Sequence, residues 1–303
     1  MNNPLFSILV ANYNNGHFFM DCYLSIINQT YSNWEVVIVD DASTDDSVAI
    51  IKQLIRNDHR FKLFLNAENK GCGYTKNRCA KLSQGEILGF LDPDDALKND
   101  AVSVMVEAHC LNRKASIITS KYELVDLEMN FISNGLYGCS LPFDKSFLTY
   151  ANGALTHFAT FKNKHYFQSC GIDPVMKRAV DQDLYYKLEE KGQHLFINKI
   201  LYRYRIHKNS ISHNDNLYKA DYWHFYAINK AYQRRKKQKI DNFTSEYMRV
   251  YRSNYYLSRF IKLKFSQKNK TKYYFLFKSI FANPIHEFEL KIKSLLLLFI
   301  RRI

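Results

Sequence analysis

Residues 34–46 read Trp-Glu-Val-Val-Ile-Val-Asp-Asp-Ala-Ser-Thr-Asp-Asp, and this stretch decides the fold class. Its first seven residues form an apolar run that is typical of a β-strand. The hydroxyl and acidic side chains at 43–46 are typical of a helix start, so we expect a helix at 47–57. A strand that passes directly into a helix is the repeating unit of an α/β protein.

The same alternation continues on both sides of this stretch. Strand alternating with helix at this spacing predicts a mainly parallel sheet with helices on both faces. Ligands of such sheets bind beyond the carboxyl ends of the strands. The further strands are expected at 6–12, 61–65, 86–91 and 115–120, and the further helices at 18–28, 74–83 and 101–112.

The rest of the chain is less regular at first and then strongly helical. Residues 121–213 are rich in aromatic side chains and contain one expected helix, at 181–191. The pattern then becomes basic and helical, so we expect one domain over 1–213 and a helical region over 214–303. Within that region the helices are expected at 216–239, 244–265, 272–281 and 285–303.

Charge and cysteine content limit the class of protein. The net charge is +14, and residues 215–303 hold 20 Lys and Arg against 6 Asp and Glu, so the body of the chain is neutral. A nucleic-acid-associated basic protein is an alternative, but the body lacks the charge and the chain shows no RNA-binding signature.

No Cys-x-x-Cys pair occurs among the six cysteines, which predicts reduced thiols in a cytosolic protein. No basic segment followed by an apolar stretch opens the chain, so we expect no secretory signal.

A second stretch points to the chemistry. Residues 89–95 read Gly-Phe-Leu-Asp-Pro-Asp-Asp, an apolar strand that ends in three carboxylates. Anions this close repel one another unless a cation lies among them, and oxygen ligands suit Mg²⁺ or Mn²⁺, which usually bring a phosphate. The alternative is an ordinary turn, because Pro and Asp are common turn residues.

Four motifs follow one another along the chain. They are Ser-Ile-Leu-Val-Ala-Asn-Tyr-Asn at 7–14, Val-Ile-Val-Asp-Asp-Ala-Ser-Thr-Asp at 37–45, Asn-Lys-Gly at 69–71 with Asn-Arg at 77–78, and Leu-Asp-Pro-Asp-Asp at 91–95. In this order they resemble a family 2 glycosyltransferase with the GT-A fold, of the type that builds bacterial surface polysaccharides. The resemblance covers residues 5–213 and implies a nucleotide-binding half (1–120) and an acceptor half (121–213).

The resemblance implies a donor site for a sugar nucleotide, expected to be a UDP-sugar, and for Mn²⁺ or Mg²⁺. Asp94 is expected to bind the metal directly, and Asp92 to act through ribose hydroxyls or a metal-bound water. Asp41 is expected to accept a hydrogen bond from the base or its ribose, with Ala11 and Tyr13 lining the base pocket. For Tyr13 the alternative is packing at the sheet edge. Asp40 suits a turn or helix cap as well as it suits a ligand.

Further residues follow from the same resemblance. Lys76 stands where the family commonly has Arg, and offers phosphate a positive charge without a bidentate grip. In the segment 202–212, which resembles Tyr-Arg-x-His, Arg205 is expected to neutralise phosphate and His207 to contact metal or phosphate. Asp181 opens an expected helix as the general base, although Val180 replaces the family's Glu; the alternative is that this acid only complements the helix dipole. His157 is expected on the acceptor side.

The expected activity is therefore transfer of a sugar to a hydroxyl of a lipid-linked or cell-surface glycan precursor, by single displacement with inversion. The departures at Val180 and Lys76 leave a catalytically silent scaffold as an alternative.

The basic C-terminal region carries an apolar stripe of its own. This stripe predicts an amphipathic helix at an anionic membrane surface, reached through residues 255–303, with the protein peripheral on the cytoplasmic face of the plasma membrane. The alternative is a helical cap on the catalytic domain. The stripe consists of Ile285, Phe288, Ile292, Leu295, Leu296, Phe299 and Ile303, flanked by Lys291, Lys293, Arg301 and Arg302.

Overall fold

The computed structural model describes two units of the chain, Met1–Ala231 and Tyr232–Ile303. The residues described are 3–143, 145–150, 154, 156–207, 217–240, 245–263 and 271–300, without the side chains of 217–219 and 297–300. The expected boundary at 213/214 and the segment 208–212 lie outside these residues, as do the stripe residue Ile303, its flanking Arg301 and Arg302, and the side chain of Phe299.

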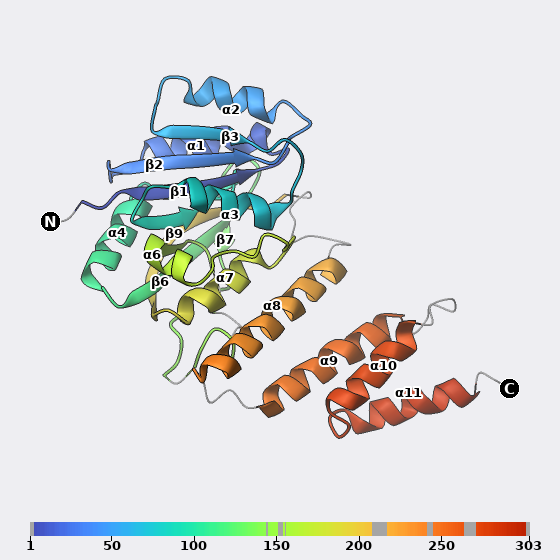
Figure 1. The fold of residues 1–303 in the computed structure, drawn as a ribbon. Coiled ribbons are helices and arrows are strands. Elements are labelled where there is room, and N and C mark those ends of the chain that lie inside the picture. Colours follow the sequence, from blue (N-terminus) through green and yellow to red (C-terminus); the bar gives the residue numbers. More distant parts are fainter. Residues whose placement is uncertain are drawn as a thin grey trace. The chain divides into compact units, whose positions relative to one another are not determined.

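The first unit is built on a mixed sheet that has nine strands within the described residues (Figure 1). The strand order is β3-β2-β1-β4-β8-β6-β9-β5, and β7 pairs with β6. The first four strands run parallel, as do β6 and β9, whereas β5, β7 and β8 pair antiparallel. The strands are β1 (Phe6–Asn12), β2 (Trp34–Asp40), β3 (Phe61–Leu65), β4 (Ile87–Phe90), β5 (Ala96–Leu97), β6 (Ala115–Val125), β7 (Phe131–Asn134), β8 (Ala159–Lys162) and β9 (Gln193–Arg205).

Helices cover both faces of this sheet. Phe6, Ile8 and Val10 of β1 point into a core shared with α1, α2 and α4, and the alternate residue Leu9 is buried on the other face, where α3 contacts β1 and β2. Strand alternation thus separates the two helical layers. The helices of this unit are the 3₁₀ turn η1 (Gly16–Phe18), α1 (Phe19–Ile27), α2 (Ser47–Ile55), α3 (Cys72–Leu82), α4 (Ala101–Leu111), α6 (Asn163–Gln168), α7 (Val180–Glu189) and most of α8 (Leu217–Gln238).

The α/β fold expected from the sequence is confirmed, and β1, β2 and β3 have the expected bounds. Several elements were not expected, among them β5, β7, β8 and α6. The strand at 115–120 continues to Val125, and residues 193–205, read as irregular, form the thirteen-residue strand β9. The burial of β9 is irregular because Gln193–Lys199 is largely half-buried or exposed, so no clean alternation marks it.

The second unit contains α9 (Ser245–Leu263), α10 (Thr271–Ala282) and α11 (Phe288–Ile300), with a core of Leu257, Phe260 and Leu276. Two expectations for its apolar stripe are wrong. Leu295 packs against this core because it lies on the inner side of α11. Lys291 is 2% exposed, since its ammonium donates to Ser253 Oγ at 2.7 Å and to the carbonyls of Asn283 and His286. Across the described residues, every helix is too short or too polar to cross a bilayer.

Candidate active site

Asp40 ends β2 and Asp41 follows it, and their side chains hydrogen-bond to different parts of the chain. Asp40 Oδ2 accepts hydrogen bonds from Asn12 Nδ2 at 2.7 Å and Ser43 Oγ at 2.6 Å, and Oδ1 accepts from the Ser43 backbone N–H at 2.8 Å. These bonds tie the ends of β1 and β2 to the turn before α2. Of the two roles left open for Asp40, the structure therefore gives it the turn.

Asp41 fixes the loop that leads into α3. Its Oδ1 accepts from Asn66 Nδ2 at 2.6 Å and from the Lys70 N–H at 2.9 Å, and its Oδ2 accepts from the Gly71 N–H at 2.7 Å. Gly71 adopts a φ of +88°, a conformation that side chains rarely take. Ala11 is half-buried and Tyr13 is exposed near the same sheet edge. The expectation that these three residues bind the base stays a prediction.

Lys76 joins two carboxylates that lie far apart in sequence. Its Nζ lies 3.2 Å from Asp92 Oδ1 and 3.1 and 3.3 Å from the two Asp181 oxygens. The lysine is buried on α3, whereas each carboxylate is 33% exposed. Burial acts to lower the pKa of Lys76, but Asp181 and Asp92 outweigh it and hold that pKa well above its ordinary value. Lys76 therefore remains charged.

A close contact between backbones positions α3 against α7. The Gly73 N–H donates to the Met176 carbonyl at 2.9 Å, and a Cβ on Gly73 would lie 2.3 Å from that oxygen. Only glycine allows this approach. Met176 precedes Asp181 by five residues, and Gly73 precedes Lys76 by three. The contact thus sets the distance between the lysine and the acid that opens α7.

The Asp-Pro-Asp-Asp loop after β4 is held from β9. Tyr202 Oη donates to Asp95 Oδ2 at 2.7 Å and accepts from the Asp92 N–H at 3.3 Å. Asp95 Oδ1 accepts from the Arg205 N–H at 2.8 Å. Burial, and then Asp94 and Asp92, hold the pKa of Asp95 well above its ordinary value. Asp95 is therefore an internal anchor of the loop.

Arg205 lies beneath this loop and is 2% exposed. Its Nε donates to the Asp94 carbonyl at 2.7 Å, one terminal nitrogen donates to the Leu127 carbonyl, and the other contacts Asp21 Oδ2 at 2.5 Å. Its guanidinium also lies 4.7 Å from the centre of the Phe18 ring. These contacts give Arg205 a supporting role, and phosphate binding by it stays a prediction.

Asp94 and His207 form a pair that suits a divalent cation. His207 Nε2 lies 2.9 Å from Asp94 Oδ2. Burial and the neighbouring Asp92 raise the pKa of Asp94, and His207 opposes the rise. Within the described residues, no cluster of three or more His, Cys, Asp or Glu side chains could enclose a metal alone. The Asp94 carboxylate fits Mn²⁺ or Mg²⁺, because these ions prefer oxygen ligands and commonly take the remaining ones from substrate phosphates and water, whereas the His207 imidazole is a less typical ligand for them.

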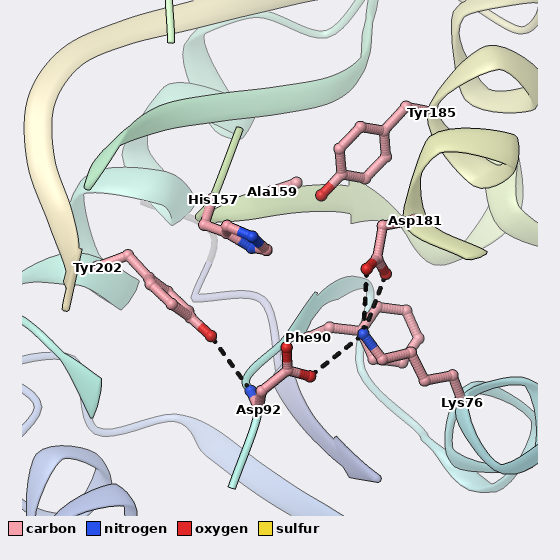
Figure 2. Close-up of a pocket in the computed structure, with 8 residues that line it drawn as sticks. All are labelled: Lys76, Phe90, Asp92, His157, Ala159, Asp181, Tyr185 and Tyr202. Atoms are coloured by element: carbon pink, nitrogen blue, oxygen red, sulfur yellow. Dashed lines mark hydrogen bonds and ion pairs between the residues drawn. The ribbon is translucent and has the colours of Figure 1, made fainter. Parts of the chain in front are cut away.

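A small polar cavity lies between the Asp-Pro-Asp-Asp loop and α7, shown in Figure 2. Lys76, Asp92 and Asp181 meet on one side of it. Burial would raise the pKa of Asp92, but Lys76 and His157 outweigh it and keep that pKa below its ordinary value. Its other walls are Ala159 and the rings of Phe90, His157, Tyr185 and Tyr202. Two carboxyl groups, an ammonium and aromatic faces thus line this cavity, and the charged groups can hydrogen-bond to a polar ligand.

Comparison with known proteins identifies the family. A family model described as "Glycosyl transferase family 2" matches residues 7–165, more than half of the chain. The chain belongs to this family.

Individual members of the family and solved structures agree with this assignment. The chain is 33% identical to chondroitin synthase of Escherichia coli over 234 residues, 76% of this chain and 33% of that relative. It is 28% identical to the putative teichuronic acid biosynthesis glycosyltransferase TuaG of Bacillus subtilis, over 70% of this chain and 82% of the relative. TarS 1–349 of S. aureus in complex with UDP-GlcNAc has the same fold, with a TM-score of 0.65, 16% identity, and coverage of 91% of this chain and 81% of that one.

The chain spans about a third of the E. coli chondroitin synthase and about a quarter of its Pasteurella multocida counterpart, to which it is 30% identical.

Sequence reasoning brought Lys76, Asp92, Asp94, Asp181 and His207 to one region, and the structure places them there. It missed the supports of the site. Tyr202 was read only as part of the motif at 202–212, and nothing in the sequence marked its hydroxyl as a partner of Asp95. Asp21 gave no signal, because its partner Arg205 lies 184 residues away. Tyr185 is one turn beyond Asp181 on α7, and helical spacing alone would have placed it on the same face.

Proposed function

We propose that this family 2 chain is an inverting, metal-assisted glycosyltransferase that moves a sugar from a UDP-sugar to a hydroxyl of a lipid-linked or cell-surface glycan precursor. The observation that carries the proposal is the meeting of Asp92 and Asp181 across Lys76, beside the Asp94–His207 pair. UDP as the nucleotide is supported by TarS, which was solved with UDP and with UDP-GlcNAc. The acceptor class is supported by the relatives named for chondroitin and teichuronic acid synthesis.

Each residue has a defined role in this reaction. Asp94 and His207 would hold the cation, and Asp92 would act beside it or at the ribose hydroxyls. When bound, the cation neutralises charge that develops on the departing diphosphate. Asp181 takes the proton of the acceptor hydroxyl as its oxygen bonds to C1 of the sugar. The bond from C1 to the phosphate oxygen breaks, and its electron pair leaves with UDP.

Lys76 supports this chemistry electrostatically. Its ammonium lies between two carboxyl groups that would otherwise repel each other, and it holds the pKa of Asp92 below its ordinary value. Proton removal needs the carboxylate form of Asp181. Asp41, Ala11 and Tyr13 line the nucleotide side at the ends of β1 and β2. Arg205 and Tyr202 fix the Asp-Pro-Asp-Asp loop, and Arg205 would add positive charge near the diphosphate.

The test is to incubate the protein with Mn²⁺ and a panel of UDP-sugars and glycan acceptors, and to measure the release of UDP. We expect one UDP-sugar to release UDP faster when its acceptor is present, and EDTA to abolish the release. Failure of every UDP-sugar, together with failure of UDP to bind in calorimetry, would overturn the proposal. Binding of UDP without any release would instead favour the catalytically silent scaffold.

We also propose that the second unit places the enzyme on an anionic membrane, on the cytoplasmic face. Phe281 is 83% exposed and Ile285 is 80% exposed, and Phe288, Ile292 and Leu296 are exposed along α11 at four-residue intervals. Residues 232–303 are strongly basic, and lysines such as Lys278 and Lys293 are exposed beside these apolar side chains. Exposed aromatic and aliphatic groups with nearby cations suit an interface of anionic lipid.

A further inference from the structure

Helix α8 carries three neighbouring aromatic rings, and it lies beyond the segment that the family model matches. The ring centroids of Tyr222 and Trp223 are 5.3 Å apart, those of Trp223 and Tyr226 are 5.5 Å apart, and those of Tyr222 and Tyr226 are 6.4 Å apart. Tyr222 is 46% exposed, and the other two residues are half-buried. These three residues form one aromatic surface, the α8 aromatic cluster.

The α8 aromatic cluster is attached to the helix that carries the proposed base. His224 Nδ1 on α8 contacts Gln182 Oε1 on α7, and Gln182 directly follows Asp181. The Tyr226 hydroxyl donates to Asp173 Oδ2 at 3.4 Å, in the segment that leads into α7. All these residues belong to the first unit, in which α8 runs beside α7 (Figure 1). The cluster therefore lies next to the first turn of α7.

The exposed side chains of this part of α8 suit a polar ligand better than a lipid. Between residues 220 and 231 they are Tyr222, His224 and Lys230, and each carries a polar or charged group. The Lys230 ammonium lies 5.2 Å from the centre of the Tyr226 ring. By contrast, the surface proposed to meet the membrane exposes the purely apolar Phe281 and Ile285. Rings that stand among polar groups are typical of a surface that binds a ligand with both apolar faces and hydroxyls.

A glycan acceptor needs such a surface. The cavity beside Asp181 has room for about one water molecule, so the sugar units behind the reacting one must bind outside it. Aromatic faces pack against the C–H faces of pyranose rings, and carboxylate and amide groups hydrogen-bond to sugar hydroxyls. The α8 aromatic cluster supplies the faces, and Asp173 and Gln182 supply the polar groups at its edge.

We propose that the α8 aromatic cluster binds the sugar units of the acceptor that lie behind the reacting one, so that the enzyme prefers an oligosaccharide of several units to a short one. The inference rests on the proposed function, because it takes Asp181 as the place where the acceptor reacts. It adds a binding surface and the length of the acceptor, which neither the family nor the named relatives determine for this chain.

Tryptophan fluorescence of the full chain tests this inference without an activity assay. The chain has two tryptophans, and Trp34 is 3% exposed with the Arg60 guanidinium 3.6 Å from its ring centre, so the emission that responds to a surface ligand comes from Trp223. The probes are oligosaccharides of two and of six units from the cellulose, chitin and chondroitin series, titrated with saturating UDP and Mn²⁺. We expect at least one hexasaccharide to change the emission, with a Kd at least about threefold below that of its disaccharide.

The other outcomes of these titrations separate the inference from the proposed function. No response to any hexasaccharide, or equal Kd values within every pair, would overturn the inference and leave the proposed function intact. A response to anionic vesicles alone would assign the α8 aromatic cluster to the membrane and would also overturn it. Failure of UDP to bind in calorimetry would overturn the proposed function, and this inference with it.

A variant tests whether the rings themselves bind the sugar. Tyr222→Ala removes the exposed ring and keeps Trp223 as the reporter, so the Kd of the hexasaccharide should rise about two- to tenfold while the affinity for UDP stays unchanged. Tyr247→Ala is the matched control, because Tyr247 is 43% exposed and stacks on Tyr251 in α9 of the second unit, with centroids 6.4 Å apart. An equal Kd in wild type, Tyr222→Ala and Tyr247→Ala would contradict the role given to the cluster.

Discussion

The substitution Asp181→Asn tests whether this acid acts as the general base, because it removes the carboxylate next to Lys76. The amide keeps the size of the side chain but cannot take a proton from the acceptor. General bases typically contribute about 10²–10⁴-fold to the rate, so we expect kcat to fall by that factor. Affinity for UDP should stay within about twofold, because Asp181 belongs to the first turn of α7 and not to the ends of β1 and β2 that are assigned to the nucleotide.

The expected loss of stability is small, and it follows from the geometry. Lys76 keeps its contact with Asp92 at 3.2 Å, and the Asp181 side chain is 33% exposed. A partly exposed ion pair contributes about 1 kcal/mol or less, which corresponds to a fall in Tm of about 4 °C or less for a unit of this size.

Asp183→Asn is the matched control. Both acids lie in the first turn of α7, but Asp183 is buried and pairs with Lys187 at 2.5 Å. Loss of a buried pair should lower the Tm more than loss of Asp181 does, while kcat changes little. The assay is steady-state UDP release with the acceptor that the wild type uses, together with thermal unfolding. Similar kcat losses in both variants, or near-wild-type kcat in Asp181→Asn, would mean that the two acids serve only the helix, and the assignment of the base would be refuted.

Three further predictions concern the supports of the site, the core and the second unit. Tyr202→Phe removes the hydrogen bond to Asp95 and should lower the free energy of unfolding, measured in urea, by about 1–3 kcal/mol. Tyr13 is exposed, so the control Tyr13→Phe should leave that free energy unchanged. Equal effects of the two substitutions would show that Tyr202 does not anchor the loop. Burial lowers the pKa of His109 to about 3, so its neutral form stabilises the fold above its ordinary pKa of 6.5, and this contribution should fall by about 2 kcal/mol as the pH drops to 5. The difference in urea stability between wild type and His109→Gln should show this slope, and a pH-independent difference would contradict it. Replacing Phe281 and Ile285 together by Ser should reduce sedimentation of the protein with anionic vesicles. The control is the same change at Leu111 and Leu136, which are 75% and 87% exposed in the first unit, and it should not reduce sedimentation. Equal binding by both double variants would argue that the second unit is a structural cap.

The sequence predicted many of the strands and helices, because each of these depends mainly on the pattern of neighbouring side chains. The strand at 34–40 lies between turn residues and contains the apolar run Val36–Val39, so its bounds followed closely. The strand β9 was missed, because its partners β6 and β5 lie far away in sequence and its own side chains show no regular alternation. Whether such a segment forms a strand depends on the strands with which it pairs, and a single sequence does not show which strands these are.

The same distinction applies to the candidate site. Motif spacing was enough to bring Asp92, Asp94 and Asp181 together, since each stands at the end of an element that faces the same edge. It did not show that Arg205 is buried beneath the loop, because that depends on Asp21 and on the Leu127 carbonyl. In the second unit, helical periodicity predicted that Lys291 lies on a basic flank of the apolar stripe. It did not predict the burial of Lys291, because this depends on hydrogen bonds to Ser253 and to backbone carbonyls.

The most direct measurement for the whole account is calorimetric titration of UDP into wild type, Asp94→Asn and Asp100→Asn, each with and without Mn²⁺. The account predicts that Mn²⁺ tightens binding of UDP to wild type and to the Asp100→Asn control, and that this effect is lost in Asp94→Asn while the fold stays intact by circular dichroism. An unchanged Mn²⁺ effect in Asp94→Asn would contradict the claim that the carboxylates at the end of β4 hold the cation beside the diphosphate.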